Sequence, residues 1–216
     1  MSFETMLQQL AGGMAQSIGI FALTLVFALP LGMIIAFGRM SKNRVISFLV
    51  RMFISVMRGT PLMLQLLVVY FGPYYLFGMD IGGNYRFCAI IIGFSINYAA
   101  YFAEIYRSGI ESMPVGQYEA AQLLGYSKFQ TFMTIILPQV IKRILPTVTN
   151  EVITLVKDTS LAFSLSYSEL FSITKQIATA NTTFMPFVVA GVFYFVFNLL
   201  VEIVMHHMEK RLSYYR

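Results

Sequence analysis

The sequence has few charged residues and a single cysteine. Only 12% of its 216 residues are Asp, Glu, Lys or Arg, whereas soluble domains carry about 25%. Hydrophobic residues make up 57% of the chain and its mean hydropathy is +0.71. This composition predicts an integral membrane protein. The lone cysteine, Cys88, lies in an apolar run and excludes a disulfide within the chain.

Signals of several other functions are also missing. His206 and His207 are adjacent, so they lie on different faces of a helix, and no Cys and His cluster has metal-ligand spacing. The segment before the first apolar run lacks the Lys or Arg of a secretory signal. No G-x-x-x-x-G-K-[ST] phosphate loop is present. We therefore expect no metal, no cofactor and no ATPase site in this chain. The net charge is +5, but the Lys and Arg residues are scattered along the chain. This distribution is typical of the loops of a membrane protein and not of a nucleic-acid-binding surface.

Long apolar runs predict an all-α membrane protein with five transmembrane helices, since one span needs about 20 apolar residues. The second run is too long for one straight crossing and contains the break RGTP at 58–61, so we expect a helix that bends there. The fourth run is weaker, because it holds Glu151, Lys157 and Asp158. The five runs are 17–38, 45–77, 87–106, 144–163 and 185–205.

The basic residues predict an orientation in the membrane. Five spans place the two termini on opposite sides, and ten Lys and Arg then fall on one side. The other side receives only Arg86 and Lys175 outside the spans. The positive-inside rule places the N-terminus outside and the C-terminus in the cytoplasm. The ten residues are Arg39, Lys42, Arg44, Arg107, Lys128, Lys142, Arg143, Lys210, Arg211 and Arg216.

Without a low-complexity linker or a convincing internal repeat, we expect a single domain over 1–216. An odd number of spans does not divide into two equal halves. The symmetry of any pore would therefore come from a second subunit.

The predicted cytoplasmic segment, about 107–143, is longer than a connector requires. Good helix formers at 117–124 are followed by Gly125, which suits a left-handed helix end. Ser127 is a residue type that caps the start of the next helix. Two short helices joined by glycine can form a knob that docks on another protein. The alternative is an amphipathic hairpin that lies on the bilayer.

The spacing within this segment resembles the EAA motif of bacterial ABC importer permeases. That motif reads E-A-A, three residues, G, nine residues and I-x-L-P. Here it corresponds to Glu119-Ala120-Ala121, Gly125 and 135–138. The two alanines permit close approach to a partner, and Glu119 supplies a charge. The resemblance implies that Glu119, Ala120, Ala121 and Gly125 form a coupling helix, which docks into a groove of a separate ATPase subunit.

The resemblance extends over about 14–212. MRGTPLMLQL at 57–66, NYAAYFAEIYRSGIESMPVGQYEAAQLLG at 97–125 and LVKDTSLAFSLSYSEL at 155–170 look like the polar amino acid permeases for histidine, glutamine, glutamate and arginine. This implies a type I ABC importer permease fold in the bacterial cell membrane. It also implies partners: a dimer of ATPase subunits that bind ATP and Mg, an extracytoplasmic amino-acid-binding protein, and a second permease subunit. We expect a homodimer, and a heterodimer with a sister permease stays open.

Ionisable residues within a span are candidates for a binding site. Glu151 and Asp158 are seven residues apart and share a helical stripe with Thr154. A carboxylate that faces a cavity favours a cation, which predicts arginine, lysine or histidine as substrate. An amide is common at the position of Glu151 in the permeases that the chain resembles, so this carboxylate can set selectivity. The structural alternative is that Lys157 neutralises either carboxylate.

The α-carboxylate of an amino acid substrate would need hydrogen-bond donors, and Gln65, Asn97 and Thr60 are candidates. Buried amides such as Gln65 and Asn97 often only join neighbouring helices. Arg58 can pair with a carboxylate or contact lipid headgroups, and the sequence does not decide between them. Two other functions remain open: an importer for neutral polar amino acids such as glutamine, and a stand-alone secondary transporter or channel.

Overall fold

The computed structural model describes residues 1–212, except for the side chains of 83 and 84. All regular elements in this part of the chain are helical, as predicted. They are α1 (Phe3–Arg39), α2 (Arg44–Gly59), α3 (Leu62–Phe77), α4 (Gly83–Glu111), α5 (Val115–Leu123), α6 (Lys128–Gln130), the π-helix η1 (Thr131–Ile136), α7 (Leu137–Asp158), the 3-10 helix η2 (Thr159–Leu165), α8 (Leu170–Asn181) and α9 (Met185–Leu212).

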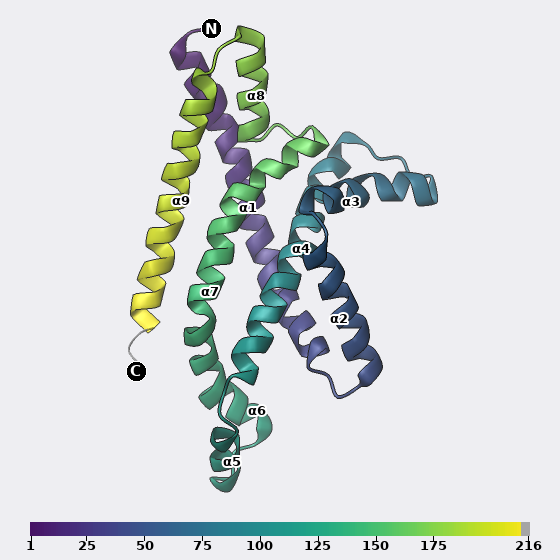
Figure 1. Cartoon of the computed structure of the whole chain (residues 1–216), viewed down its shortest axis with the longest axis vertical. Helices are drawn as coiled ribbons and strands as arrows, with labels where there is room; N and C mark the ends of the chain where they lie inside the picture. The colour runs from purple at the N-terminus through teal and green to yellow at the C-terminus, as the bar shows by residue number, and fades with distance from the viewer. Residues whose placement is uncertain (213–216) are drawn as a thin grey trace.

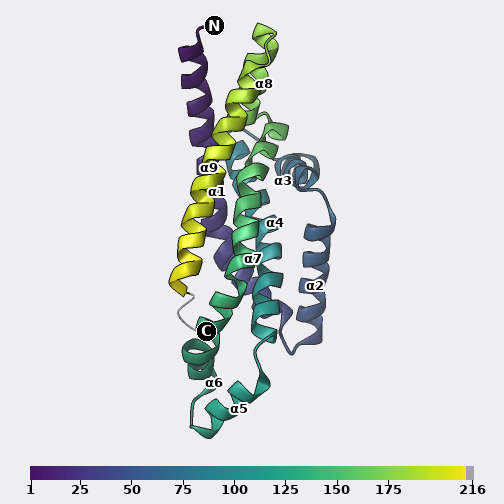
Figure 2. The ribbon, with the colours of Figure 1, turned by 60° about the vertical axis from the view of Figure 1, so that its left-hand side comes forward.

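The molecule is elongated, with the N-terminus and α8 at one end and α5 and α6 at the other (Figure 1). Viewed from two directions, α9 lies on one flank and α2 on the other, with α4 and α7 between them (Figures 1 and 2). This arrangement places α4 next to both α2 and α7.

Local sequence signals set several helix ends. The Ser2 side chain accepts a hydrogen bond from the Thr5 amide at 3.2 Å, and Asn43 accepts one from the Val45 amide at 2.9 Å. These are the N-caps of α1 and α2. At its other end, α3 stops at Gly78, whose φ of +64° is the left-handed conformation that glycine adopts without strain. The helix boundaries therefore follow from neighbouring residues.

The packing of α1 against α4 forms the centre of the protein. Phe94 and Phe102 of α4 are fully buried. Gly32 of α1 permits this close approach, since a Cβ at that position would lie 2.9 Å from the Phe102 Cβ and 3.1 Å from the Ala99 carbonyl oxygen. Small residues at such contacts are typical of helix packing in membranes. The opposite side of α4 is thus free to face α2 and α7.

Within residues 1–212, three helices are long and apolar enough to cross a membrane: α1, α4 from Tyr85, and α9. The pair of α2 and α3 adds a fourth candidate, but the two helices are bent by 112°. The bend falls at the RGTP break and confirms the sequence prediction. The expected fourth span, 144–163, lies in the charged helix α7 and in η2 and does not reach the apolarity of the others. The count of five spans stays a prediction.

The fold gathers the predicted cytoplasmic segments at one end. The lower part of the molecule in Figure 1 contains the C-terminal ends of α1, α4 and α9, the N-terminal ends of α2 and α7, and the α5–α6 segment. Eight of the ten basic residues belong to these segments, and Lys42 lies in the turn that joins α1 to α2. The tenth, Arg216, lies outside the described residues. The side of the membrane on which this end lies stays a prediction.

Candidate functional site: a polar cavity and an exposed helical loop

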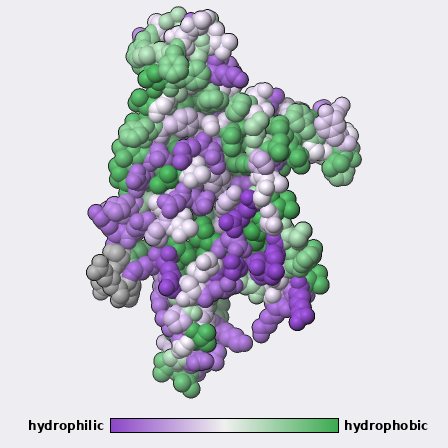
Figure 3. Space-filling model, in the orientation of Figure 1, coloured by the Kyte–Doolittle hydropathy of each residue, from purple (hydrophilic) through white to green (hydrophobic). Residues whose placement is uncertain are grey.

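A polar cavity of about 470 Å³ lies between α2, α4 and α7. Its lining includes Arg58 from the last turn of α2, Tyr101 and Glu104 from α4, and Glu151 from α7. Hydrophilic side chains gather on the face that carries these three helices (Figure 3). The fold therefore brings the predicted site residue Glu151 to a cavity with charges of both signs.

Glu151 is half-buried and makes no hydrogen bond or ion pair within 4 Å with the residues that the structure describes. The guanidinium carbon of Arg58 lies 5.3 Å from the centre of the Tyr101 ring, a cation–π contact. Arg58 and Glu151 carry opposite charges and line the same cavity. The cavity thus presents a carboxylate and a guanidinium that are not joined to each other by a salt bridge.

Asp158 lies at the C-terminal end of α7, and its side chain has different neighbours from that of Glu151. The Tyr98 hydroxyl donates a hydrogen bond to Asp158 Oδ2 at 2.7 Å, and Asp158 is not among the residues that line the cavity. Thr154 is exposed, and its hydroxyl donates to the Asn150 carbonyl at 2.9 Å. Lys157 is also exposed and forms no ion pair with either carboxylate among residues 1–212. The partner of Asp158 is therefore a tyrosine 60 residues away.

Gln65, Asn97 and Thr60 form a network with one another. Gln65 Nε2 donates to the Thr60 hydroxyl at 2.8 Å and to the carbonyls of Thr60 and Met57 at 3.1 and 2.9 Å. Asn97 Nδ2 donates to Gln65 Oε1 at 2.9 Å and to the Met57 carbonyl at 3.1 Å. These amide donors hold the α2–α3 break against α4. This supports the structural alternative for both amides, and their contact with substrate stays a prediction.

Sequence reasoning did not single out Glu104, although it is an ionisable residue in a predicted span. Arg107 donates to the Glu104 carboxylate from Nη2 at 2.7 Å and from Nε at 3.1 Å, and Arg39 Nε lies 3.7 Å away. The i, i+3 spacing of Glu104 and Arg107 was a signal for the first pair. No sequence signal indicated Arg39, because it comes from α1.

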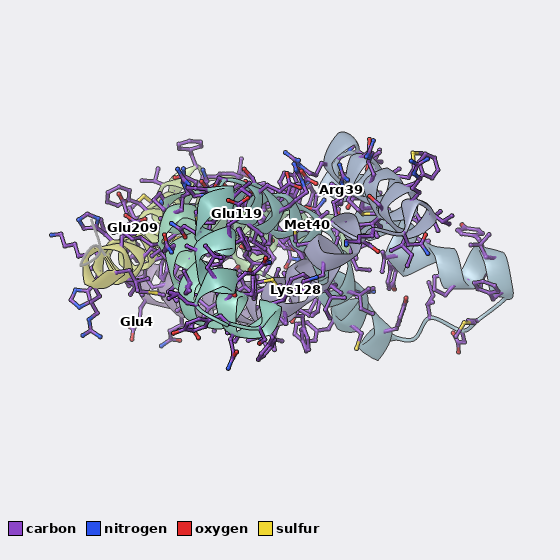
Figure 4. The ribbon with its side chains drawn as sticks, turned by 90° about the horizontal axis from the view of Figure 1, so that it is seen from below. Glu4, Arg39, Met40, Glu119, Lys128 and Glu209 are labelled. Atoms are coloured by element: carbon purple, nitrogen blue, oxygen red, sulfur yellow. The ribbon has the colours of Figure 1, made fainter. Side chains whose placement is uncertain are left out.

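The predicted coupling segment forms an exposed helical loop. In α5, Glu119 and Ala120 are exposed, whereas Ala121 is 1% exposed and packs within this chain. We expected Ala121 on the docking surface. The structure buries its side chain within this chain, and its contact with an ATPase subunit stays a prediction. Gly125 follows with φ +81°, as its position at a left-handed helix end predicted. Seen from below, Glu119 and Lys128 lie on this end of the molecule (Figure 4).

Ser127 begins the next helix, as predicted. Its hydroxyl accepts from the Gln130 amide while Gln130 Oε1 accepts from the Ser127 amide, which completes a capping box. The helix that Ser127 caps continues without a break through the π-helix η1 into α7, past Pro138. The loop is therefore joined to the helix that carries Glu151.

Two side-chain contacts fasten the loop to the start of α7. Gln117 and Gln139 exchange hydrogen bonds through their amides at 2.9 and 2.8 Å. Arg143 Nη1 donates to the carbonyl of Ser112 at 2.8 Å and to its hydroxyl at 3.1 Å. A displacement of α5 would thus be transmitted to α7 through hydrogen bonds as well as through the backbone.

Residues 28–214 match the model of one protein family, described as binding-protein-dependent transport system inner membrane component. The chain belongs to this family. It is therefore a multi-pass inner-membrane permease of an ABC importer, and as the membrane component it is a transport subunit rather than an ATPase. The alternative of a stand-alone transporter or channel is not retained.

Individual relatives agree with this assignment. The chain is 35% identical to a putative glutamine transport system permease protein of Rickettsia bellii (strain RML369-C), over 88% of this chain and 86% of the relative. It is 33% identical to an arginine transport system permease protein of Bacillus subtilis (strain 168), over 93% and 91%. A crystal structure of an amino acid ABC transporter with histidines superposes with a TM-score of 0.86 at 31% identity, over 98% and 99% of the two chains. The resemblance to polar amino acid permeases is confirmed.

Proposed function

We propose that this permease forms the pore of an ATP-driven importer for basic amino acids, with Glu151 as the group that binds the cationic side chain. The observation that carries the proposal is a half-buried carboxylate without a salt bridge at the wall of a cavity of about 470 Å³. Burial of a carboxylate without a salt bridge is costly, so the site is stabilised when a cation binds to it. The arginine permease relative and the structure solved with histidines support a basic substrate.

A neutral polar amino acid such as glutamine is the second candidate. The putative glutamine permease is slightly more similar in sequence than the arginine permease. In that case Arg58 would be the permanent counter-ion of Glu151, and the two charges would bind only the backbone groups of the substrate. The two candidates therefore differ in whether Glu151 contacts the side chain.

Coupling to ATP hydrolysis is proposed to pass through α5. The exposed residues Glu119 and Ala120 would contact a groove of an ATPase subunit, which holds ATP and Mg. Gly125, which follows α5, would set the orientation of α5 relative to α6. The end of the molecule that carries α5 would then be cytoplasmic, and an extracytoplasmic binding protein would deliver the amino acid at the other end. Two copies of this chain would enclose the pore.

Competition for the membrane site tests the substrate class. We expect the detergent-solubilised permease–ATPase complex, without its binding protein, to bind labelled L-arginine. Unlabelled lysine and histidine should displace this label, whereas glutamine should displace it only at far higher concentration. The isolated ATPase serves as the control and should bind no label. Equal displacement by glutamine and lysine would favour the neutral alternative.

A further inference from the structure

Three arginines line the cavity beside Glu151, and two of them are already engaged. Arg107 donates hydrogen bonds to Glu104 and Glu111, and Arg143 donates to Ser112. Arg58 differs, because within residues 1–212 its specific contact is the face of the Tyr101 ring at 5.3 Å. A ring face leaves the edge of the guanidinium, with its N–H donors, available to a ligand. Arg58 is thus the cation of this cavity that can receive an anion.

The chemistry of an amino acid supplies that anion. Every α-amino acid carries an α-carboxylate, whatever its side chain, and guanidinium binds carboxylate through two parallel hydrogen bonds. We expected the amides of Gln65 and Asn97 to donate to this carboxylate. In the structure they hydrogen-bond to each other and to backbone carbonyls. A volume of about 470 Å³ is within the usual range for small-molecule sites.

The same amide network places Arg58. Met57 precedes it directly, and the Met57 carbonyl accepts from both Gln65 and Asn97. The Thr60 carbonyl, two residues after it, accepts from Gln65. The last turn of α2 is therefore held against α3 and α4 at the point where Arg58 enters the cavity. Gln65 and Asn97 become positioning residues in this arrangement.

We propose that Arg58 binds the α-carboxylate of the transported amino acid, opposite the group that Glu151 binds. This deepens the proposed function and rests on the cavity being the substrate site. It does not require a basic side chain on the substrate. Arg58 would then bind the α-carboxylate, which all amino acids share. Glu151 would bind the cationic side chain, which distinguishes basic amino acids from neutral ones.

Agmatine tests this assignment, because it is arginine without the α-carboxylate. Equilibrium binding is measured on the solubilised permease–ATPase complex without the binding protein. The wild type should bind L-arginine about 10- to 100-fold more tightly than agmatine, the usual effect of a charge-assisted hydrogen bond. Arg58→Gln should weaken L-arginine by a similar factor and should not weaken agmatine, because agmatine has no carboxylate for Arg58 to bind. Arg58→Lys should retain part of the arginine affinity, because lysine keeps the positive charge but cannot donate two parallel hydrogen bonds to a carboxylate.

Arg51→Gln is the matched control. Arg51 lies seven residues earlier on the same stripe of α2 and does not line the cavity, so neither ligand should change affinity. Equal effects of Arg58→Gln on arginine and agmatine, or no effect on either, would overturn the proposal, since a structural role does not distinguish the two ligands.

The comparison of L-glutamine with its α-amide separates this proposal from the assignment of Glu151. If Glu151→Gln leaves arginine binding unchanged, the basic-substrate function fails. Arg58→Gln should still weaken glutamine and spare its α-amide. Loss of both glutamine and its α-amide to the same extent would contradict the role of Arg58.

Discussion

Gly125→Val should abolish substrate-stimulated ATP hydrolysis while the permease remains folded and inserted. Gly125 has φ +81°, a conformation that a β-branched side chain cannot adopt without strain. The turn between α5 and α6 must then rearrange, and α5 loses its direction relative to the ATPase groove. No heavy atom lies within 4 Å of the position that a Cβ would take, so the effect comes from the backbone and not from a clash.

The measurement is ATPase activity of the reconstituted complex with and without substrate-loaded binding protein. Gly12→Val is the matched control: it lies in α1, far from the proposed docking surface, has the same open surroundings and has no positive φ. We expect normal stimulation in the control. Wild-type stimulation in Gly125→Val would show that α5 is not the coupling helix.

Glu151→Gln should reduce uptake of L-arginine strongly and spare L-glutamine. A charge-assisted hydrogen bond contributes about 1.5–3 kcal/mol, which corresponds to about ten- to a hundred-fold in affinity. Glutamine keeps the shape of glutamate but not its charge, so the cavity should keep its volume and lose its attraction for a cation. Protein abundance and basal ATPase rate should change little.

Uptake of both amino acids is measured in proteoliposomes at low substrate concentration. Glu111→Gln is a suitable control, because Glu111 is 55% exposed and its pairing with Arg107 is a surface ion pair of small energetic value. Equal losses for arginine and glutamine would make Glu151 a structural residue. An unchanged arginine rate would remove it from the substrate path.

The shape of the α5–α6 loop could be predicted from the sequence because its geometry depends on near neighbours. Gly125 ends one helix, Ser127 and Gln130 cap the next, and both features follow from residues no more than three positions apart. The bend at 58–61 was predictable for the same reason. What the sequence did not indicate is that Ala121 faces inward, because that depends on how α5 packs against η1.

The cavity was only partly predictable. Helical periodicity placed Glu151 and Asp158 on one face of a helix, but it could not identify the residues of other helices that surround each carboxylate. Tyr98 reaches Asp158 across 60 positions, and Asn97 reaches Met57 across 40. Such contacts depend on how α2, α4 and α7 pack. Arg58 stayed ambiguous in the sequence for this reason, and its place beside Tyr101 became visible only in the fold.

The most direct test of the account is a structure of the permease–ATPase complex with L-arginine bound in the membrane. We predict the guanidinium of the ligand at hydrogen-bond distance from the Glu151 carboxylate, and its α-carboxylate toward Arg58. Arginine bound elsewhere, or in the reverse orientation with its side chain away from Glu151, would contradict the account.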